Sequence, residues 1–296
     1  DIVGVPVHAG TLARALARHA DYRVLSRLKP ISRTALRNRG PGELTVCVID
    51  VETTGLDYRE DRIIELAVRN VVVNGHGRIV EAGRARSWLE DPGRPIPPEI
   101  TVVTGLRDED VKGKVIADGE AYSMISDADI RLAHNAAFDR PFVEARLGLG
   151  GEPWICSLND IDWRAHGFEG RSLSQLLATC GWFFDAHRAA GDVEALIHLL
   201  DHDLENGRTV MRELIVGAGR SSWRVSAVGA DFDASPSLRK RRYRWDAARR
   251  TWWKDVWQDD LSEECDWLTE VVYQGRRLPE VREITWRDRY SADTVH

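Results

Sequence analysis

The chain has 296 residues, of which 43% are hydrophobic and 30% are charged, and its formal net charge at pH 7 is −6. This balance is typical of a soluble globular protein with one large domain or two ordinary ones. No run approaches the ~18 apolar residues that a membrane span requires, which excludes an integral membrane protein.

The first two thirds of the chain are predicted to fold as an α/β domain. Residues 44–50 (LTVCVID) form a short apolar run that suits a buried strand. The runs 62–75 and 77–89 are rich in β-formers on either side of an Asn-Gly-His-Gly turn. Strands then alternate with helices, which predicts a mixed sheet flanked by helices. The other expected helices and strands lie within residues 11–28, 96–105, 115–126, 129–148, 153–158, 171–181, 189–207 and 207–219.

The tail differs from the rest in composition. Residues 1–214 hold 26 Lys and Arg against 33 Asp and Glu, whereas residues 215–296 hold 15 against 14 and seven of the eleven tryptophans. We therefore expect a helix and linker over residues 1–40, a main domain over 41–215 and a small α+β domain over 220–296. The tail strands and helices are expected in alternation over residues 223–232, 235–243, 251–257, 262–273 and 281–290.

The cysteines indicate the compartment. Cys47, Cys156, Cys180 and Cys265 are scattered and show no CxxC spacing. This argues against a disulfide framework and a cysteine-based zinc site, and it suits a reducing environment. No positively charged start leads into an apolar stretch, so no secretory leader is expected. The sequence predicts a cytoplasmic protein.

Two acids end the first buried strand. The sequence VIDVETTGLD places Asp50 and Glu52 at i and i+2, where strand side chains point to the same face. Two carboxylates repel each other there, and a divalent cation such as Mg²⁺ or Mn²⁺ removes that cost. An Asp-x-Glu pair alone is more often a solvated strand end. The Thr-Thr-Gly-Leu that follows favours a ligand site, because it adds a tight turn with backbone donors.

Two later motifs add further acids and a histidine. The motif HNAAFDRPF places Asn135 where it is expected to cap a helix, and Asp139 on the first turn of that helix. Open α/β sheets bind ligands at these strand ends. The motif HRAAGDVEALIHLL places His187 before a helix and Asp192 at its start. Taken singly, a capped helix with a solvated acid explains the first motif equally well, and a lone histidine is more often a packed or solvated residue.

Taken together, the three motifs resemble those of the DEDDh exonucleases, the DnaQ-like family that includes the proofreading subunit of bacterial replicases. The resemblance runs over residues 44–205. The segment IPPEITVVTG also resembles the family's contact to the terminal nucleotide. The likeness implies a ribonuclease-H-like fold with a mixed sheet flanked by helices. It shows no departure at the five catalytic positions, which are Asp50, Glu52, Asp139, His187 and Asp192.

The resemblance also implies a mechanism. Two Mg²⁺ or Mn²⁺ ions, held by Asp50, Glu52, Asp139 and Asp192, would clamp the attacking and leaving oxygens at phosphorus. His187 would take the proton from the attacking water. The substrate would contact Thr53, Thr54, Gly55, Leu56, Asn135 and Phe138. For Leu56 and Phe138, a place in the ordinary core is an equally good interpretation.

The tail is dense in arginine and tryptophan. Seven basic residues accompany one acid, Asp246, between Arg239 and Arg250. Arginines among aromatic side chains are typical of single-strand or junction binding, and a solvated basic helix beside core tryptophans is the alternative. The predicted nucleic-acid patch consists of Arg239, Lys240, Arg241, Arg242, Arg244, Arg249 and Arg250.

These features predict a metal-dependent 3′–5′ exonuclease of the proofreading or repair type, which releases nucleoside 5′-monophosphates from DNA 3′ ends. The alternatives are a 3′–5′ exoribonuclease, a non-catalytic nucleic-acid-binding module and a replicase subunit with an assembly role. The intact set of acids argues against a relic site. The expected partners are nucleic acid with a free 3′ end, DNA ahead of RNA, and replication or repair proteins, without a membrane. Deletion of residues 220–296 is expected to spare the cleavage of short strands, because the five catalytic residues precede them.

Overall fold

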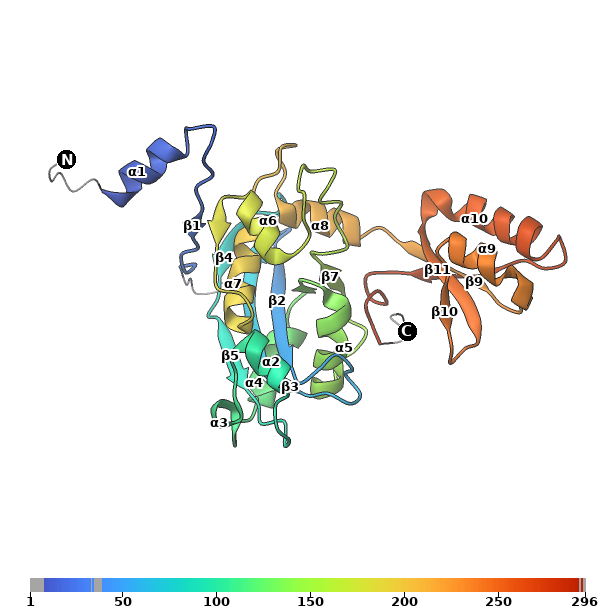
Figure 1. Ribbon diagram of the computed structural model, residues 1–296, viewed down its shortest axis with the longest axis horizontal. Helices are drawn as coiled ribbons and strands as arrows, with labels where there is room; N and C mark the ends of the chain where they lie inside the picture. The colour runs from blue at the N-terminus through green and yellow to red at the C-terminus, as the bar shows by residue number, and fades with distance from the viewer. Residues whose placement is uncertain (1–7, 33, 35–38, 293, 295–296) are drawn as a thin grey trace.

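The computed structural model describes residues 8–32, 34, 39–292 and 294. Its largest element is a six-stranded mixed sheet with strand order β4-β3-β2-β6-β7, to which β5 is added by pairing with β3 (Figure 1). Helices flank this sheet, so the mixed α/β fold predicted from the sequence is confirmed. The strands are β2 (Leu44–Thr53), β3 (Ile63–Val73), β4 (Ile79–Ala82), β5 (Arg86–Leu89), β6 (Ile130–Ala133) and β7 (Trp154–Cys156).

Strand β2 is central and is covered on both faces. Its residues from Val46 to Ile49 are fully buried, with alternate side chains on opposite faces. Strand β2 is antiparallel to β3 and parallel to β6, which is parallel to β7. The strands β2, β6 and β7 therefore all end at one end of the sheet, which we call the carboxyl end. One face packs against α6 (Leu173–Thr179), α7 (Ala189–Leu200) and α8 (Val210–Ala218), and the other against α4 (Asp118–Ser126) and α5 (Ala136–Leu147).

The N-terminal helix is shorter than predicted. Helix α1 spans Ala9–Leu16 instead of residues 11–28. Residues Ser26–Arg27 form the short strand β1, which pairs in parallel with β8 (Trp182–Phe183). This pairing holds the backbone extended where the apolar spacing alone predicts a helix.

Helix α7 also ends earlier than predicted, at Leu200 instead of residue 207. Asp203 forms a β-bridge with Thr209, and Gly207 adopts a φ of 77°, so the chain turns back before α8 begins. Helix α2 (Pro98–Thr104) begins at a proline, as predicted, and is followed by the single-turn α3 (Asp108–Val111). Among the described helices, none is long and apolar enough to cross a membrane.

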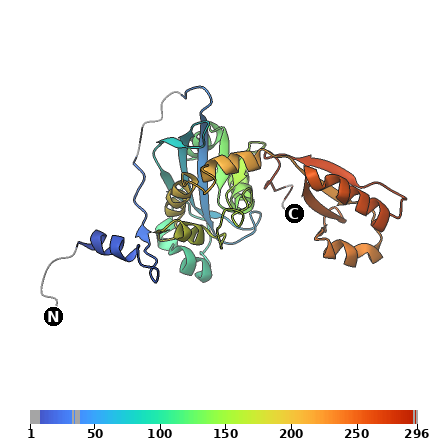
Figure 2. The ribbon, with the colours of Figure 1, turned by 90° about the horizontal axis from the view of Figure 1, so that it is seen from above.

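The tail forms a second sheet of four antiparallel strands in the order β10-β11-β9-β12. Figures 1 and 2 show this sheet and its helices to one side of the main sheet. Val225, Leu238, Trp252 and Leu268 form the centre of a separate hydrophobic core beneath the helices. The short β10 was not predicted, and β12 ends before residue 290. The elements are β9 (Ser222–Ala227), α9 (Ser235–Lys240), β10 (Arg244–Asp246), β11 (Thr251–Trp257), α10 (Leu261–Trp267) and β12 (Glu280–Ile284).

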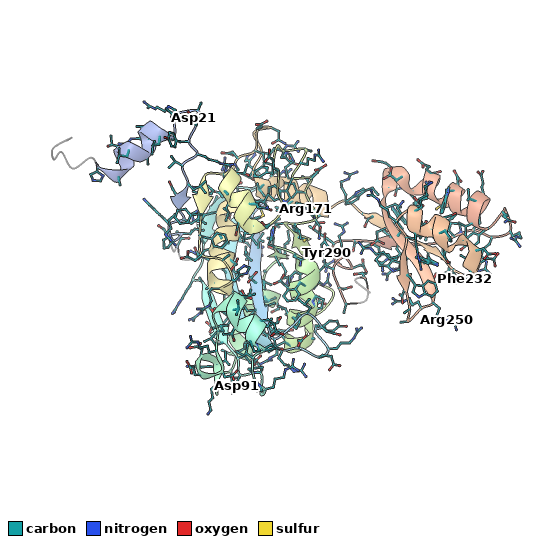
Figure 3. All side chains as sticks on the ribbon, in the orientation of Figure 1. Asp21, Asp91, Arg171, Phe232, Arg250 and Tyr290 are labelled. Atoms are coloured by element: carbon teal, nitrogen blue, oxygen red, sulfur yellow. The ribbon has the colours of Figure 1, made fainter. Side chains whose placement is uncertain are left out.

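After β12, the chain returns to the main domain. We call residues 285–292 the return segment, in which Tyr290 lies against the main part of the molecule (Figure 3). The buried guanidinium of Arg140 donates to the carbonyl oxygens of Arg287 at 2.8 Å and Arg289 at 2.7 Å. Arg140 directly follows a predicted catalytic acid in the sequence. These contacts argue against the expectation that the whole tail is dispensable for cleavage.

Candidate active site

Three carboxylates converge at the carboxyl end of the main sheet. Asp50 and Glu52 end strand β2, and Asp192 lies on the first turn of α7. Helix α7 packs on the face of β2 that carries Val46 and Val48, and the strand pleat places Asp50 and Glu52 on that same face. One potential ligand atom from each of the three acids lies within 4.8 Å of the other two. This all-oxygen set suits a hard divalent cation such as Mg²⁺ or Mn²⁺.

Asp139 reaches the same strand from the opposite face of the sheet. It lies on the first turn of α5, is only 2% exposed, and its Oδ1 accepts the Val51 backbone N–H at 3.1 Å. Asn135 occupies the N-cap position of α5 with a φ of 81°, but its side chain makes no capping hydrogen bond. The expectation that Asn135 caps the helix is therefore wrong. Its left-handed backbone turns the chain sharply from β6 into α5, which brings Asp139 close to β2.

Burial raises the pKa values of the four acids, and neighbouring carboxylates add to the rise. Burial, followed by Asp192 and Glu65, raises the pKa of Glu52 to about 7. Burial raises the pKa of Asp192 to about 6, although the Arg188 backbone N–H opposes this shift. Burial, followed by the neighbouring carboxylates, raises the pKa of Asp50 well above its usual range. A bound cation would reverse these shifts, because it favours the charged carboxylates.

Two residues near the acids were not predicted as site residues. Glu65 lies directly opposite Glu52 in the β2–β3 register and is 2% exposed. It accepts hydrogen bonds from Ser87 Oγ at 2.7 Å and from Arg188 Nε at 3.0 Å. A lone acid inside the apolar run RIIELAV was the available signal, because a buried acid needs a partner. Arg188 supplies that partner from the residue just before α7.

His187 borders the site without joining the cluster of three acids. It is exposed, and its φ of 69° places it in the left-handed region at the turn into α7. Its charge acts on Asp192, whose pKa it lowers. The position leaves the imidazole open to solvent beside the acids, where a proton acceptor for an attacking water would be needed.

The loop after β2 is held in place by a polar network. Arg94 Nη2 donates to Thr54 Oγ1 and to Asp61 Oδ1, each at 2.7 Å. A Cβ at Gly55 would lie 2.4 Å from Asp61 Oδ2, so a larger residue here would displace the Asp61 side chain from this network. The network presents Leu56, which is 86% exposed, to solvent. The interpretation of Leu56 as a core residue is therefore wrong.

The other predicted substrate residues lie around the same strand end. Thr53 is 5% exposed, and its Oγ1 donates to the carbonyl oxygen of Gly55 at 2.5 Å. Phe138 is half-buried, and its ring centroid lies 5.1 Å from that of Phe142. Phe138 therefore packs partly on the core and keeps part of its surface free.

The predicted nucleic-acid patch of the tail is partly neutralised. Arg241 donates to Glu263 and Glu264, each at 2.9 Å, and Arg249 donates to Asp246 at 3.0 Å. Only part of the predicted patch therefore offers free charge. The patch members without an ion pair to any acid in the described ranges are Arg239, Lys240, Arg242, Arg244 and Arg250.

The fold and the converging acids are matched by a known family. Residues 47–200 match the model of the exonuclease family, RNase T type, and the chain belongs to this family. The family predicted from the three motifs is thereby confirmed. The match ends at residue 200 and does not extend to the tail.

The related proteins include bacterial replicases. The chain is 40% identical over 168 residues to the PolC-type DNA polymerase III of Listeria welshimeri, over 54% of this chain and 11% of that polymerase. It is 35% identical over 122 residues to a DNA polymerase III subunit epsilon-like protein of Rhodobacter capsulatus, over 40% of this chain and 17% of that protein. A solved structure of Exonuclease X with 5′ overhanging duplex DNA is 25% identical, with a TM-score of 0.41 over 58% of this chain and 99% of that chain. The chain thus spans a small part of the polymerases that it matches.

Proposed function

We propose that the chain is a metal-dependent 3′–5′ exonuclease that hydrolyses DNA at its 3′ ends and releases nucleoside 5′-monophosphates. The observation that carries the proposal is the convergence of Asp50, Glu52 and Asp192 in a member of the exonuclease family. Two of the related proteins are DNA polymerase III proteins, which favours DNA over RNA as the substrate. Replication or repair proteins are proposed as partners on the same ground.

The four acids would divide the binding of two Mg²⁺ or Mn²⁺ ions. Asp50, Glu52 and Asp192 would hold one ion, and Asp50 with Asp139 would hold the second. When bound, the two ions stabilise the attacking and leaving oxygens of an in-line displacement at phosphorus. The hydrogen bond from the Val51 N–H to Asp139 Oδ1 holds this carboxylate against β2, which supports such a role.

His187 would act as the general base. Its imidazole would accept a proton from the attacking water, and its exposed position would let that proton pass to solvent. The terminal nucleotide would lie along Thr53, Thr54, Gly55 and Leu56. The exposed Leu56 side chain offers an apolar surface for a base or sugar. Asn135 and Phe138 would contact the adjoining nucleotide.

We also propose that residues 41–215 form the catalytic domain and residues 220–296 an accessory domain. The separate sheet and the separate hydrophobic core of the tail support this division. The return segment of the accessory domain contacts the catalytic domain through Arg140.

The test uses end-labelled DNA and RNA oligonucleotides, each with a free or a blocked 3′ end, incubated with Mg²⁺. We expect stepwise shortening of the free DNA strand from its 3′ end, with nucleoside 5′-monophosphates as products. The blocked strands should persist, and the variant Asp192→Asn should be inactive. Shortening from the 5′ end, or robust cleavage in excess chelator, would contradict the proposal. Faster digestion of RNA than of DNA would favour the exoribonuclease alternative.

A further inference from the structure

One face of the second sheet is left open by the described helices. Helices α9 and α10 pack on the face of Val225 and Trp252, and the pairing register places Arg224, Arg244 and Trp253 on the opposite face, which we call the open face. Arg244 and Trp253 are direct neighbours across β10 and β11. The guanidinium carbons of Arg224 and Arg244 lie 3.7 Å and 5.4 Å from the Trp253 ring centroid.

A cavity of ≈ 330 Å³ lies between the open face and the main domain. Arg224, Arg244 and Trp253 line it from the tail, and Ala137 and Asn159 line it from the main domain. Ala137 follows β6 and Asn159 follows β7, so the cavity borders the carboxyl end of the main sheet. This is the end at which the catalytic acids lie. The volume is at the lower limit of typical ligand pockets, ~300–1,000 Å³, and suits a group of about nucleotide size.

The two acids that line this cavity are already paired. Asp255 accepts two hydrogen bonds from the guanidinium of Arg224, at 2.8 and 2.9 Å. Asp160 accepts one from Arg289 at 3.0 Å and one from Tyr290 at 2.7 Å. Neither acid is left to attract a cation or to repel an anion at short range.

Two side chains that line the same cavity carry donors without acceptors. Trp253 is 5% exposed, and its indole N–H is buried without a hydrogen-bond partner among the described residues. Arg244 is exposed and forms neither an ion pair nor a hydrogen bond through its side chain with any described residue. An unpaired buried donor costs about 1–3 kcal/mol, and most such groups in proteins have a partner. A ligand that only accepts hydrogen bonds and carries negative charge fits these two groups.

We propose that this cavity binds the sugar–phosphate backbone of a single DNA strand, upstream of the 3′ end that occupies the acidic site. The inference rests on the proposed function, because it takes the acidic site as the place of the 3′ end. A phosphodiester supplies only acceptors and one negative charge, which matches the free guanidinium of Arg244 and the indole N–H of Trp253. The cavity borders the ends of β6 and β7, at the same carboxyl end of the main sheet as the acidic site on β2 and α7, and the proposed strand runs along this end from one to the other.

The proposed strand-binding surface lies on the open face and does not include α9. The patch predicted from the sequence includes Arg239 and Lys240, which lie on the helix that covers the other face of the sheet. Arg239 resembles Arg244 in its setting, because it is exposed and its guanidinium carbon lies 5.5 Å from the Trp252 ring centroid. The two arginines therefore provide a matched pair that distinguishes one face of the sheet from the other.

The test measures the binding of a labelled single-stranded DNA longer than the ~4–16 nucleotides that single-strand-binding domains occupy, in Ca²⁺ to limit turnover and across a salt series. Arg244→Ala should weaken binding about tenfold and reduce the salt slope by ~0.7, the value for one phosphate contact on a single strand. Trp253→Phe keeps an aromatic ring at this position and removes the pyrrole ring with its N–H, so it should weaken binding. Urea unfolding of this variant should show that the sheet still folds.

The matched controls are Arg84→Ala and Arg239→Ala. Arg84 is exposed, lies beside β4 at the opposite edge of the main sheet, and forms no ion pair with a described acid. Its removal should leave affinity and salt slope unchanged. If Arg239→Ala weakens binding as much as Arg244→Ala, or if Arg244→Ala behaves as Arg84→Ala does, the proposed strand site is wrong.

Hydrolysis of the p-nitrophenyl ester of thymidine 5′-monophosphate separates this inference from the proposed function. That substrate has no upstream strand, so Arg244→Ala and Trp253→Phe should hydrolyse it at the rate of the unaltered chain. Failure of the unaltered chain to cleave either this ester or any oligonucleotide would overturn the proposed exonuclease. Normal cleavage by that chain, with no specific loss of strand binding in Arg244→Ala, would overturn only the strand site.

Discussion

The carboxyl end of the main sheet and the open face of the second sheet carry opposite unpaired charges. The first gathers Asp50, Glu52 and Asp192 within reach of one another, with raised pKa values. On the open face, Asp255 is paired with Arg224, and Arg244 has no acidic partner among the described residues. Unpaired like charges are unfavourable unless an opposite charge binds to them, so the sign of the charge in each region predicts the charge of its ligand. We expect the acidic site to bind cations and the open face to bind a polyanion.

The largest effect should come from removal of a metal ligand. Asp192→Asn and Glu52→Gln each delete a carboxylate that would hold a cation. In metal sites generally, even the loss of a residue that only supports a ligand costs ~10–100-fold in metal affinity or activity. We expect either variant to lose more than about 100-fold in turnover with Mg²⁺. Titration of Mg²⁺ against hydrolysis of a short DNA strand measures the loss.

The matched control for these variants is Glu205→Gln. Glu205 is an exposed acid in the turn after α7, so its change alters the net charge equally without touching the site. Its activity should equal that of the unaltered chain. Near-normal turnover in Asp192→Asn or Glu52→Gln would show that the acidic cluster is not the metal site.

The next effect concerns the general base. His187→Ala should keep Mg²⁺ binding and lose about 10²–10⁴-fold in rate, which is the usual contribution of general acid–base catalysis. The loss should shrink as the pH rises, because hydroxide replaces the missing base. A pH–rate profile with a parallel Mg²⁺ titration tests this. An equal fall in Mg²⁺ affinity would instead identify His187 as a metal ligand.

The placement of the acids at one end of the sheet could be predicted from the sequence, whereas their surroundings could not. Asp50, Glu52, Asp139 and Asp192 sit in short motifs whose positions relative to a strand end or helix start follow from local periodicity. Glu65 became a neighbour of Glu52 only through the β2–β3 register, which no local pattern specifies.

In the tail, the sequence likewise could not show which basic side chains are paired with acids. The spacing of arginines between Arg239 and Arg250 predicted one basic patch. The structure pairs Arg241 and Arg249 with acids and separates Arg244 from Arg239 by the thickness of a sheet. Figure 3 shows Arg250 at the end of the β10–β11 hairpin. Long-range pairing, which depends on the fold, decides which charges remain free.

A third effect tests how the two regions are joined. A chain that ends at Ile284 loses the return segment, and with it the two carbonyl acceptors of the buried Arg140. It also loses the Trp286 carbonyl, which accepts the Trp154 N–H at 2.9 Å. Hydrogen bonds to charged groups contribute ~1.5–3 kcal/mol each, so the free energy of unfolding should fall by about 3 kcal/mol or more.

Urea unfolding of the truncated and full chains measures this fall. Tyr290→Phe, which removes only the hydrogen bond to Asp160, should cost about 1 kcal/mol and serve as the graded comparison. Activity on short strands should fall with stability, since Arg140 adjoins Asp139 on α5. Unchanged stability and unchanged cleavage in the truncated chain would make the return segment dispensable and the two domains independent.

The smallest effect concerns the stability of the metal-free protein as a function of pH. The folded pKa values of Glu52, about 7, and Asp192, about 6, lie above the usual carboxyl range. The folded state therefore binds more protons than the unfolded state between about pH 4 and pH 7, so stability should decrease as the pH rises through this window. The expected decrease is on the order of 2 kcal/mol after screening by solvent. Glu52→Gln removes one of the acids with a raised pKa and should flatten the dependence. Saturating Mg²⁺ should reverse the sign of the slope, because the ion binds the deprotonated acids. Thermal or urea unfolding across this pH range, with chelator or with Mg²⁺, measures both slopes. A metal-free protein that gains stability from pH 4 to pH 7 would show that the acids are better solvated or better paired than their burial indicates.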